Sequence, residues 1–134
     1  DGALYRLAST GTEPQQVQHM ALLLLAFWNA VKATWPDIWH LGPRKSRLLH
    51  GAGIVSLGFL MDAMADRRRD TVPDMGFFMT ELRKIKSACR WNEGFWEFGS
   101  DHMRRWDDIQ NTSKDVQLVS SHLSRLYLRT WSRG

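Results

Sequence analysis

The sequence predicts an all-α protein, a single compact domain of about five helices around a central apolar helix. The length of 134 residues suits one domain. Hydrophobic residues make up 43% and charged residues 24%, which is typical of a globular chain and argues against disorder. No segment alternates apolar and polar residues for long enough to indicate a strand. We therefore expect residues 1–134 to form one helical domain, cut from a longer protein.

The first expected helix runs from about Pro14 to Trp35. Proline fits the first turn of a helix, and Pro36 disfavours helical geometry at the residue before it. Residues 20–28 are apolar on every side, which predicts the enclosed central helix. This run is much shorter than the roughly 20 residues that span a membrane, so no membrane partner is expected. No export signal is recognisable, and a cytoplasmic location is expected.

The next two helices are expected at residues 44–65 and 71–90. Glycines 51, 53 and 58 in the second helix predict either close approach of another helix or a kink. Thr71 and Asp74 form a capping pair at the start of the third helix. The third helix also carries Cys89 on its apolar face, where burial is expected. As the only cysteine, it excludes an intrachain disulfide and a multi-cysteine zinc site.

Residues 91–110 are the least regular part of the chain, with a short helix expected at 101–109. The many aromatic residues in the first half of this stretch should fold back onto the helices. Thr112 is expected to begin the last helix. Its apolar face comprises Val116, Val119, Leu123, Leu126, Tyr127 and Trp131.

Nothing in the sequence requires an enzyme, although catalysis is not excluded. No two histidines stand four residues apart, so no helical metal pair is present, and we predict no catalytic residue, metal site or cofactor. The residues most able to bind a metal are Asp101, Asp107 and Asp108. A small metal-assisted nuclease built on them is the least favoured hypothesis.

Basic clusters give a stronger indication of function. Lysine and arginine outnumber aspartate and glutamate by 18 to 14, and the pI is about 9.6. One cluster begins the second expected helix, one ends it, and one precedes Trp106. The helix ends lie about 30 Å apart at 1.5 Å per residue, which suits an extended polyanion better than one phosphate. Solubilising surface charge is the alternative. The predicted anion-binding residues are Arg44, Lys45, Arg47, Arg67, Arg68, Arg69, Arg104 and Arg105.

Three segments carry a resemblance to a known family. They are residues 27–39 (FWNAVKATWPDIW), residues 50–54 (HGAGI) and residues 106–115 (WDDIQNTSKD). Their order resembles the C-terminal helical half of bacterial DGQHR-domain proteins, which include relatives of DndB. The family's name motif, Asp-Gly-Gln-His-Arg, is absent, because Asp1 and Gly2 are followed by Ala3. No active-site residue is therefore carried over.

The resemblance implies a role in bacterial DNA modification or defence, through DNA binding or regulation. The first hypothesis is a non-enzymatic module that contacts the DNA backbone through its basic clusters. The alternative is a protein–protein interaction or oligomerisation module without a nucleic-acid role. It would bind a second copy or a neighbouring domain through exposed tryptophans such as Trp96 or Trp131.

Overall fold

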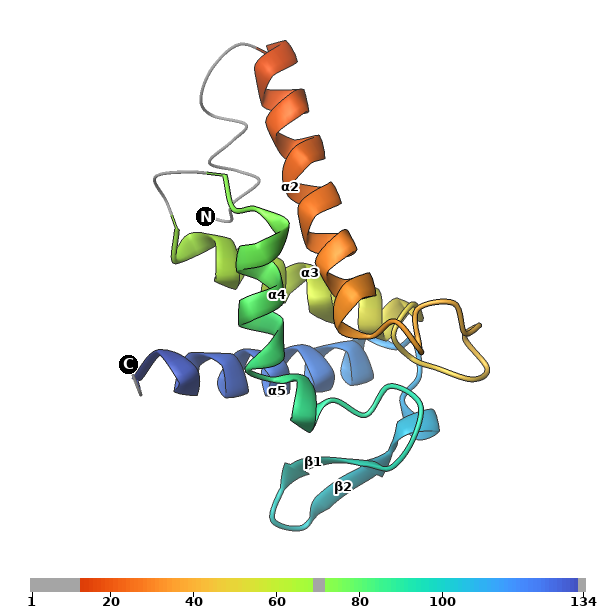
Figure 1. Cartoon of the computed structure of the whole chain (residues 1–134). Coiled ribbons are helices and arrows are strands. Elements are labelled where there is room, and N and C mark those ends of the chain that lie inside the picture. Colours follow the sequence, from red (N-terminus) through yellow and green to blue (C-terminus); the bar gives the residue numbers. More distant parts are fainter. Residues whose placement is uncertain (1–12, 69–71, 133–134) are drawn as a thin grey trace.

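The computed structural model describes residues 13–68 and 72–132. They form four α-helices, one two-stranded hairpin and two short 3-10 turns (Figure 1). The predominantly helical class is confirmed. The expectation of about five helices without strands is wrong, because only four α-helices occur in the described ranges and residues 95–105 form a hairpin. Within the same ranges, no helix is both long and apolar enough to cross a membrane.

The four helices pack as two crossed pairs. Helix α2 (Glu13–Thr34) packs mainly on α4 (Met75–Arg83), and α3 (Gly51–Asp66) packs mainly on α5 (Ser113–Ser132). Figure 1 shows α2 and α4 running steeply across the other pair. Burial of apolar side chains from all four helices forms one core. Its fully buried members include Leu23, Phe27, Leu57, Leu60, Met64, Phe78, Leu82, Leu123 and Tyr127.

The prediction that residues 20–28 form an enclosed central helix is wrong. Leu23 and Phe27 are fully buried, but Leu22 and Leu25 remain 50% and 60% exposed. The reason is that α2 packs mainly on one helix, and its N-terminal half extends beyond the other helices (Figure 1). Helix α3 is enclosed more fully, with eight of its residues buried: Ala52, Gly53, Ser56, Leu57, Leu60, Met61, Met64 and Ala65.

Helix starts follow local hydrogen bonds that the sequence reveals only in part. Helix α3 begins at Gly51 and not at residue 44, because turns occupy residues 43–45 and His50 Nδ1 accepts a hydrogen bond from the Ala52 amide. Asp74 caps α4 by accepting from the Phe77 amide, while Thr71 lies outside the described residues. Helix α4 ends at Arg83, and a 3-10 turn, η1 (Lys86–Ala88), follows. The start of α5 after Thr112 is confirmed.

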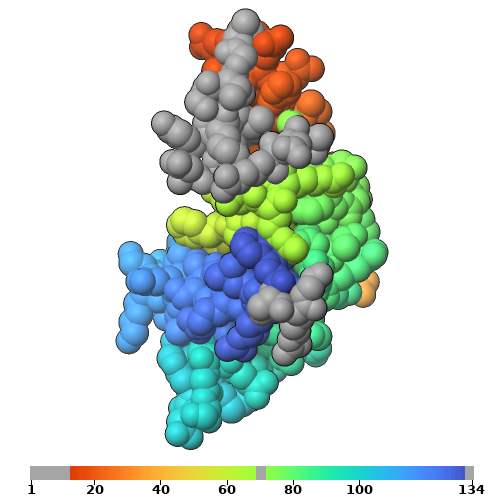
Figure 2. All heavy atoms as spheres, turned by 90° about the vertical axis from the view of Figure 1, so that its left-hand side faces the viewer, coloured from red at the N-terminus to blue at the C-terminus, as the bar shows by residue number. Residues whose placement is uncertain are grey.

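The hairpin consists of β1 (Phe95–Gly99) and β2 (His102–Arg105), paired antiparallel. A second 3-10 turn, η2 (Trp106–Asp108), follows it directly. Trp96 is fully buried, and the ring of Phe98 lies 5.0 Å from that of His122 on α5, so the hairpin packs against α5. Figure 2 shows this end of the molecule opposite the N-terminal part of α2.

The predicted inward folding of the aromatic segment is confirmed, since Trp91 and Trp96 are buried. The expected helix at 101–109 is wrong, because those residues contain β2 and η2. Trp96 also cannot be the exposed anchor that the sequence suggested, and Trp131 is partly buried against Tyr127. The expected apolar face of α5 is confirmed, with Val119, Leu123 and Tyr127 buried.

Candidate nucleic-acid interface

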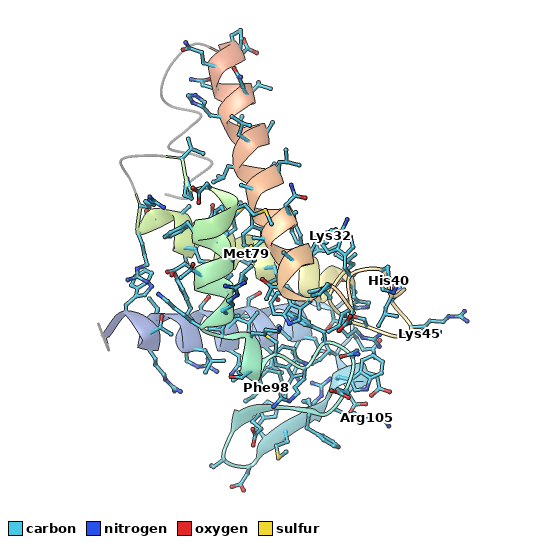
Figure 3. The ribbon with its side chains drawn as sticks, viewed as in Figure 1. Lys32, His40, Lys45, Met79, Phe98 and Arg105 are labelled. Carbon is cyan, nitrogen blue, oxygen red and sulfur yellow. The ribbon has the colours of Figure 1, made fainter. Side chains whose placement is uncertain are left out.

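The first basic cluster lies in the segment between α2 and α3. Arg44 and Lys45 are exposed there, and Figure 3 labels Lys45. The prediction that this cluster begins a helix is wrong, because α3 starts only at Gly51. The unpaired amides and dipole of that helix therefore do not add to the attraction of Arg44 and Lys45 for an anion.

Arg47 has a structural role that accounts for most of its donors. Its Nε donates to the Ile109 carbonyl at 2.8 Å, and its Nη2 donates to the Asp107 carbonyl at 2.9 Å. Its Nη1 donates to the Pro43 carbonyl, and its guanidinium lies 5.5 Å from the centre of the Trp106 ring. Arg47 thus fastens the turn before α3 to η2. Binding a phosphate would require it to give up these contacts.

The second cluster contributes to the junction of α3, α4 and α5. Arg67 Nη1 lies 2.8 Å from Oε1 of Glu81, a residue only 4% exposed, and its guanidinium stacks 5.0 Å from the Trp131 ring. Lys84 and the Tyr127 hydroxyl also bond to Glu81. Burial raises the pKa of Glu81, but the hydrogen bonds from Lys84 and Tyr127 outweigh it, and the net pKa is lowered.

The other two members of the second cluster are Arg68 and Arg69. Arg68 is exposed and lies 5.2 Å from the Phe77 ring centre. Arg69 falls outside the described residues.

The third cluster contains two ion pairs, one partly buried and one exposed. Arg104 binds both carboxylate oxygens of Asp115, at 3.2 and 3.1 Å, and donates to the Asp108 carbonyl. The hydrogen bond from Arg104 holds the pKa of Asp115 below its usual value. Arg105 on β2 (Figure 3) makes an exposed pair with Asp107 at 3.1 Å. Arg47 and Arg104 therefore converge on residues 107–109, whereas Arg67 lies beyond the far end of α3.

A cleft of about 500 Å³ between β2 and α5 is lined by three basic side chains, and two of them are exposed. Lys114 and Arg125 lie on α5 eleven residues apart, which is about three helical turns and therefore the same side. Both are exposed, and neither forms an ion pair with another residue of the described ranges. The lining consists of His102, Arg104, Lys114, Gln117, Leu118, Ser121 and Arg125.

The cleft carries positive charge that no ion pair within residues 13–68 and 72–132 neutralises. Asp115 beside it is compensated by Arg104, so the charges of Lys114 and Arg125 remain for a ligand. The set of anion-binding residues predicted from the sequence included neither Lys114 nor Arg125. The available signal was the spacing of Lys114, Leu118, Ser121 and Arg125, which places them on one helical stripe. The position of β2 across from that stripe could not be foreseen.

The geometry offers little to the metal-assisted hypothesis. In residues 13–68 and 72–132, no group of three or more histidine, cysteine, aspartate or glutamate side chains is placed to hold a metal ion. Asp101, Asp107 and Asp108 therefore do not form such a group, and Asp107 pairs with Arg105 instead. Cys89 is buried as expected, and its burial raises the pKa of the thiol, which disfavours the reactive thiolate.

No protein-family model, curated protein or solved structure shows a significant match to this chain. The resemblance to DGQHR-domain proteins accordingly stays a prediction carried by the three sequence segments.

Proposed function

We propose that this chain is a non-enzymatic helical module that binds the phosphate backbone of DNA. The observation that carries the proposal is the cleft between β2 and α5, where Lys114 and Arg125 present uncompensated charge beside Arg104 and His102. Lysine and arginine side chains bind phosphates without reading the base sequence. The resemblance to DGQHR-domain proteins supports DNA as the polyanion, in a bacterial cytoplasmic modification or defence system.

The proposal shifts the centre of binding away from several residues that the sequence favoured. Arg47, Arg67 and Arg104 already donate to protein acceptors, and freeing them would leave buried or partly buried acceptors without partners. Lys114 and Arg125 do not carry this cost, because neither donates a hydrogen bond to a buried acceptor among the described residues. Arg44, Lys45, Arg68 and Arg105 are exposed and extend the positive surface outside the cleft.

The test is binding of a labelled DNA duplex, followed by fluorescence anisotropy at low salt. We expect a Lys114→Ala/Arg125→Ala variant to bind roughly tenfold more weakly, because two phosphate contacts are lost. The matched control is Arg83→Ala/Lys86→Ala, which removes the same charge from two exposed residues elsewhere. Equal weakening by both variants would show that only net charge matters and would contradict a localised site.

A separate variant, Arg44→Ala/Lys45→Ala, tests whether the contacts extend to the turn before α3. Loss of affinity together with a smaller salt dependence would place these residues in the interface. Unchanged affinity and unchanged salt dependence would remove them from it.

A protein–protein interaction module is the second candidate function. The observation that favours it is the exposure of large apolar side chains on α2, where Val17 is 57% and Leu25 is 60% exposed. Surfaces of this kind often mark interaction sites. Light scattering with and without duplex DNA separates the two functions. A DNA-free dimer that does not shift with DNA would favour the second.

A further inference from the structure

A second hollow in the surface adjoins the basic cleft. Helices α3 and α5 pack side by side (Figure 1), and a groove of about 650 Å³ lies between them. Val55 and Phe59, four residues apart on α3, line one wall and are 43% and 58% exposed. We call this hollow the α3–α5 groove. Its other wall comes from α5 and consists of Ser113, Val116, Gln117, Ser120, Ser121 and Ser124.

The α3–α5 groove and the basic cleft meet along one line of α5. Gln117 and Ser121, four residues apart and therefore on the same side of the helix, line both hollows. Lys114 and Arg125 line only the cleft, and Ser124 lines only the groove. One ligand can therefore occupy both hollows, with its negative charge in the cleft and an uncharged part in the groove.

The chemistry of the two linings selects the kind of ligand. The described lining of the groove combines an exposed aromatic ring with hydroxyl and amide groups, and all of its residues are uncharged. A fatty acyl chain would remove Ser121 and Ser124 from water without replacing their hydrogen bonds, which costs free energy. An unpaired base offers a flat face for stacking on Phe59 and polar edges for the hydroxyl groups. The phosphates linked to it would lie in the cleft, where Lys114 and Arg125 span roughly 16 Å of the helix.

We propose that the cleft and the α3–α5 groove together bind single-stranded DNA in preference to a duplex. This inference rests on the proposed function, because the phosphates occupy the same cleft, and it adds the form of DNA that the site selects. The bases of a duplex are paired and stacked on one another, so a base reaches Phe59 only after unstacking, which costs free energy. A single strand has no pairing to break, and stacking on the phenyl ring adds to the phosphate contacts.

The test compares the affinity of the full chain for three labelled probes by fluorescence anisotropy at physiological salt. The probes are a strand of thymidines, the same sugar-phosphate strand without bases, and a duplex of equal length. We expect the wild-type chain to bind the thymidine strand most tightly. Phe59→Ala should weaken binding of that strand about tenfold, because base stacking is lost, and should leave the other two affinities within about twofold. Unchanged binding of the strand without bases also shows that the variant is folded.

Two further variants separate this inference from the proposed function. Phe95→Ala removes a similarly exposed aromatic ring that is not among the residues lining either hollow, and it should leave all three affinities unchanged. Lys114→Ala/Arg125→Ala should weaken the binding of all three probes, because each of them carries phosphates.

The outcomes that contradict the inference differ from those that contradict the proposed function. If Lys114→Ala/Arg125→Ala weakens all probes but Phe59→Ala has no selective effect, the inference is overturned and the proposed function stands. If Lys114→Ala/Arg125→Ala changes no affinity, both are overturned. Tighter binding to phosphatidylglycerol vesicles than to the thymidine strand, lost in Phe59→Ala, would overturn the inference and assign the groove to an acyl chain.

Discussion

At the scale of single residues, Glu81 shows how a buried charge is retained. Its carboxylate is almost fully enclosed and bonds to Arg67, Lys84 and Tyr127, which come from the end of α3, from the end of α4 and from α5. A carboxylate in this position costs free energy unless all its acceptor sites are satisfied. Three donors from three parts of the chain hydrogen-bond to the carboxylate. Glu81 thereby connects the ends of α3 and α4 to α5.

We predict that Glu81→Gln lowers the free energy of unfolding at neutral pH by about 2 kcal/mol, because charge-assisted hydrogen bonds are lost. The folded pKa of Glu81 lies below its ordinary 4.5. Its stabilisation is therefore present above pH 4.5 and disappears as pH falls through the lower folded value.

Urea unfolding of both proteins between pH 7 and pH 3 measures this difference. The control is Arg105→Ala, whose exposed pair with Asp107 should contribute less than about 0.5 kcal/mol. A difference between Glu81→Gln and wild type that persists unchanged at pH 3 would contradict the assigned role of the charge.

The second prediction concerns Arg47, whose guanidinium donates hydrogen bonds to three backbone carbonyls. A lysine keeps the charge but cannot bond to several planar acceptors at once, so Arg47→Lys should destabilise the fold by about 2 kcal/mol. DNA affinity measured on the folded variant should stay within about twofold of wild type, since Arg47 is not placed in the cleft. Unchanged stability with weaker DNA binding would show that Arg47 is a phosphate ligand after all.

The limits of sequence reasoning are clearest for these charged residues. Composition and clustering correctly identified positive segments, but a sequence pattern does not show which cations are already paired. The partners are distant: Glu81 is 14 residues from Arg67 and 46 from Tyr127, and Ile109 is 62 from Arg47. Lys114 and Arg125 were overlooked because neither belongs to a run of charges, although their spacing on α5 was visible.

At the scale of elements, the N-terminal turn of α3 depends on a glycine. A Cβ at Gly53 would lie 2.1 Å from the Arg47 carbonyl oxygen and 2.3 Å from that of Leu48. These are backbone atoms and cannot move as a flexible side chain can. Gly58, in the same helix, has nothing within 4 Å of its Cβ position. Close approach therefore occurs at Gly53, against the preceding turn, and at Gly51, against the side chain of Asn111, and at neither glycine against α2.

We predict opposite effects of alanine at these two glycines. Gly53→Ala should destabilise the fold by about 3 kcal/mol through the backbone clash. Gly58→Ala should stabilise it by about 0.5–1 kcal/mol, because alanine is the better helix former. Thermal unfolding of the two variants measures both changes. A Gly53→Ala variant as stable as wild type would mean that the turn and α3 are further apart than the structure places them.

The elements were predictable to different degrees for physical reasons. Helices α2 and α5 are long, and a proline or a capping threonine marks their ends, so local rules place them closely. The hairpin has strands of five and four residues, with Gly94 in a left-handed conformation (φ 77°) just before it. Such strands are too short to establish an alternating pattern, and docking of Trp96 and Phe98 against α5 stabilises them.

At the scale of the whole molecule, the described surfaces divide into two kinds. The cleft between β2 and α5 is basic, whereas α2 exposes the apolar side chains of Val17, Leu22 and Leu25. The cleft exists only because the hairpin lies against α5. The apolar pattern of residues 20–28 was visible in the sequence, but enclosure was the wrong interpretation, since a helix that is apolar all round can also present one side to a partner.

The salt dependence of DNA binding tests the central claim most directly, because it counts the phosphate contacts. The logarithm of the association constant should fall linearly with the logarithm of salt concentration, with a slope of about 0.9 per neutralised phosphate. Lys114→Ala/Arg125→Ala should reduce the magnitude of this slope by about 1.8, while Arg83→Ala/Lys86→Ala should leave it unchanged. An identical slope in wild type and the Lys114→Ala/Arg125→Ala variant would contradict phosphate binding in the cleft.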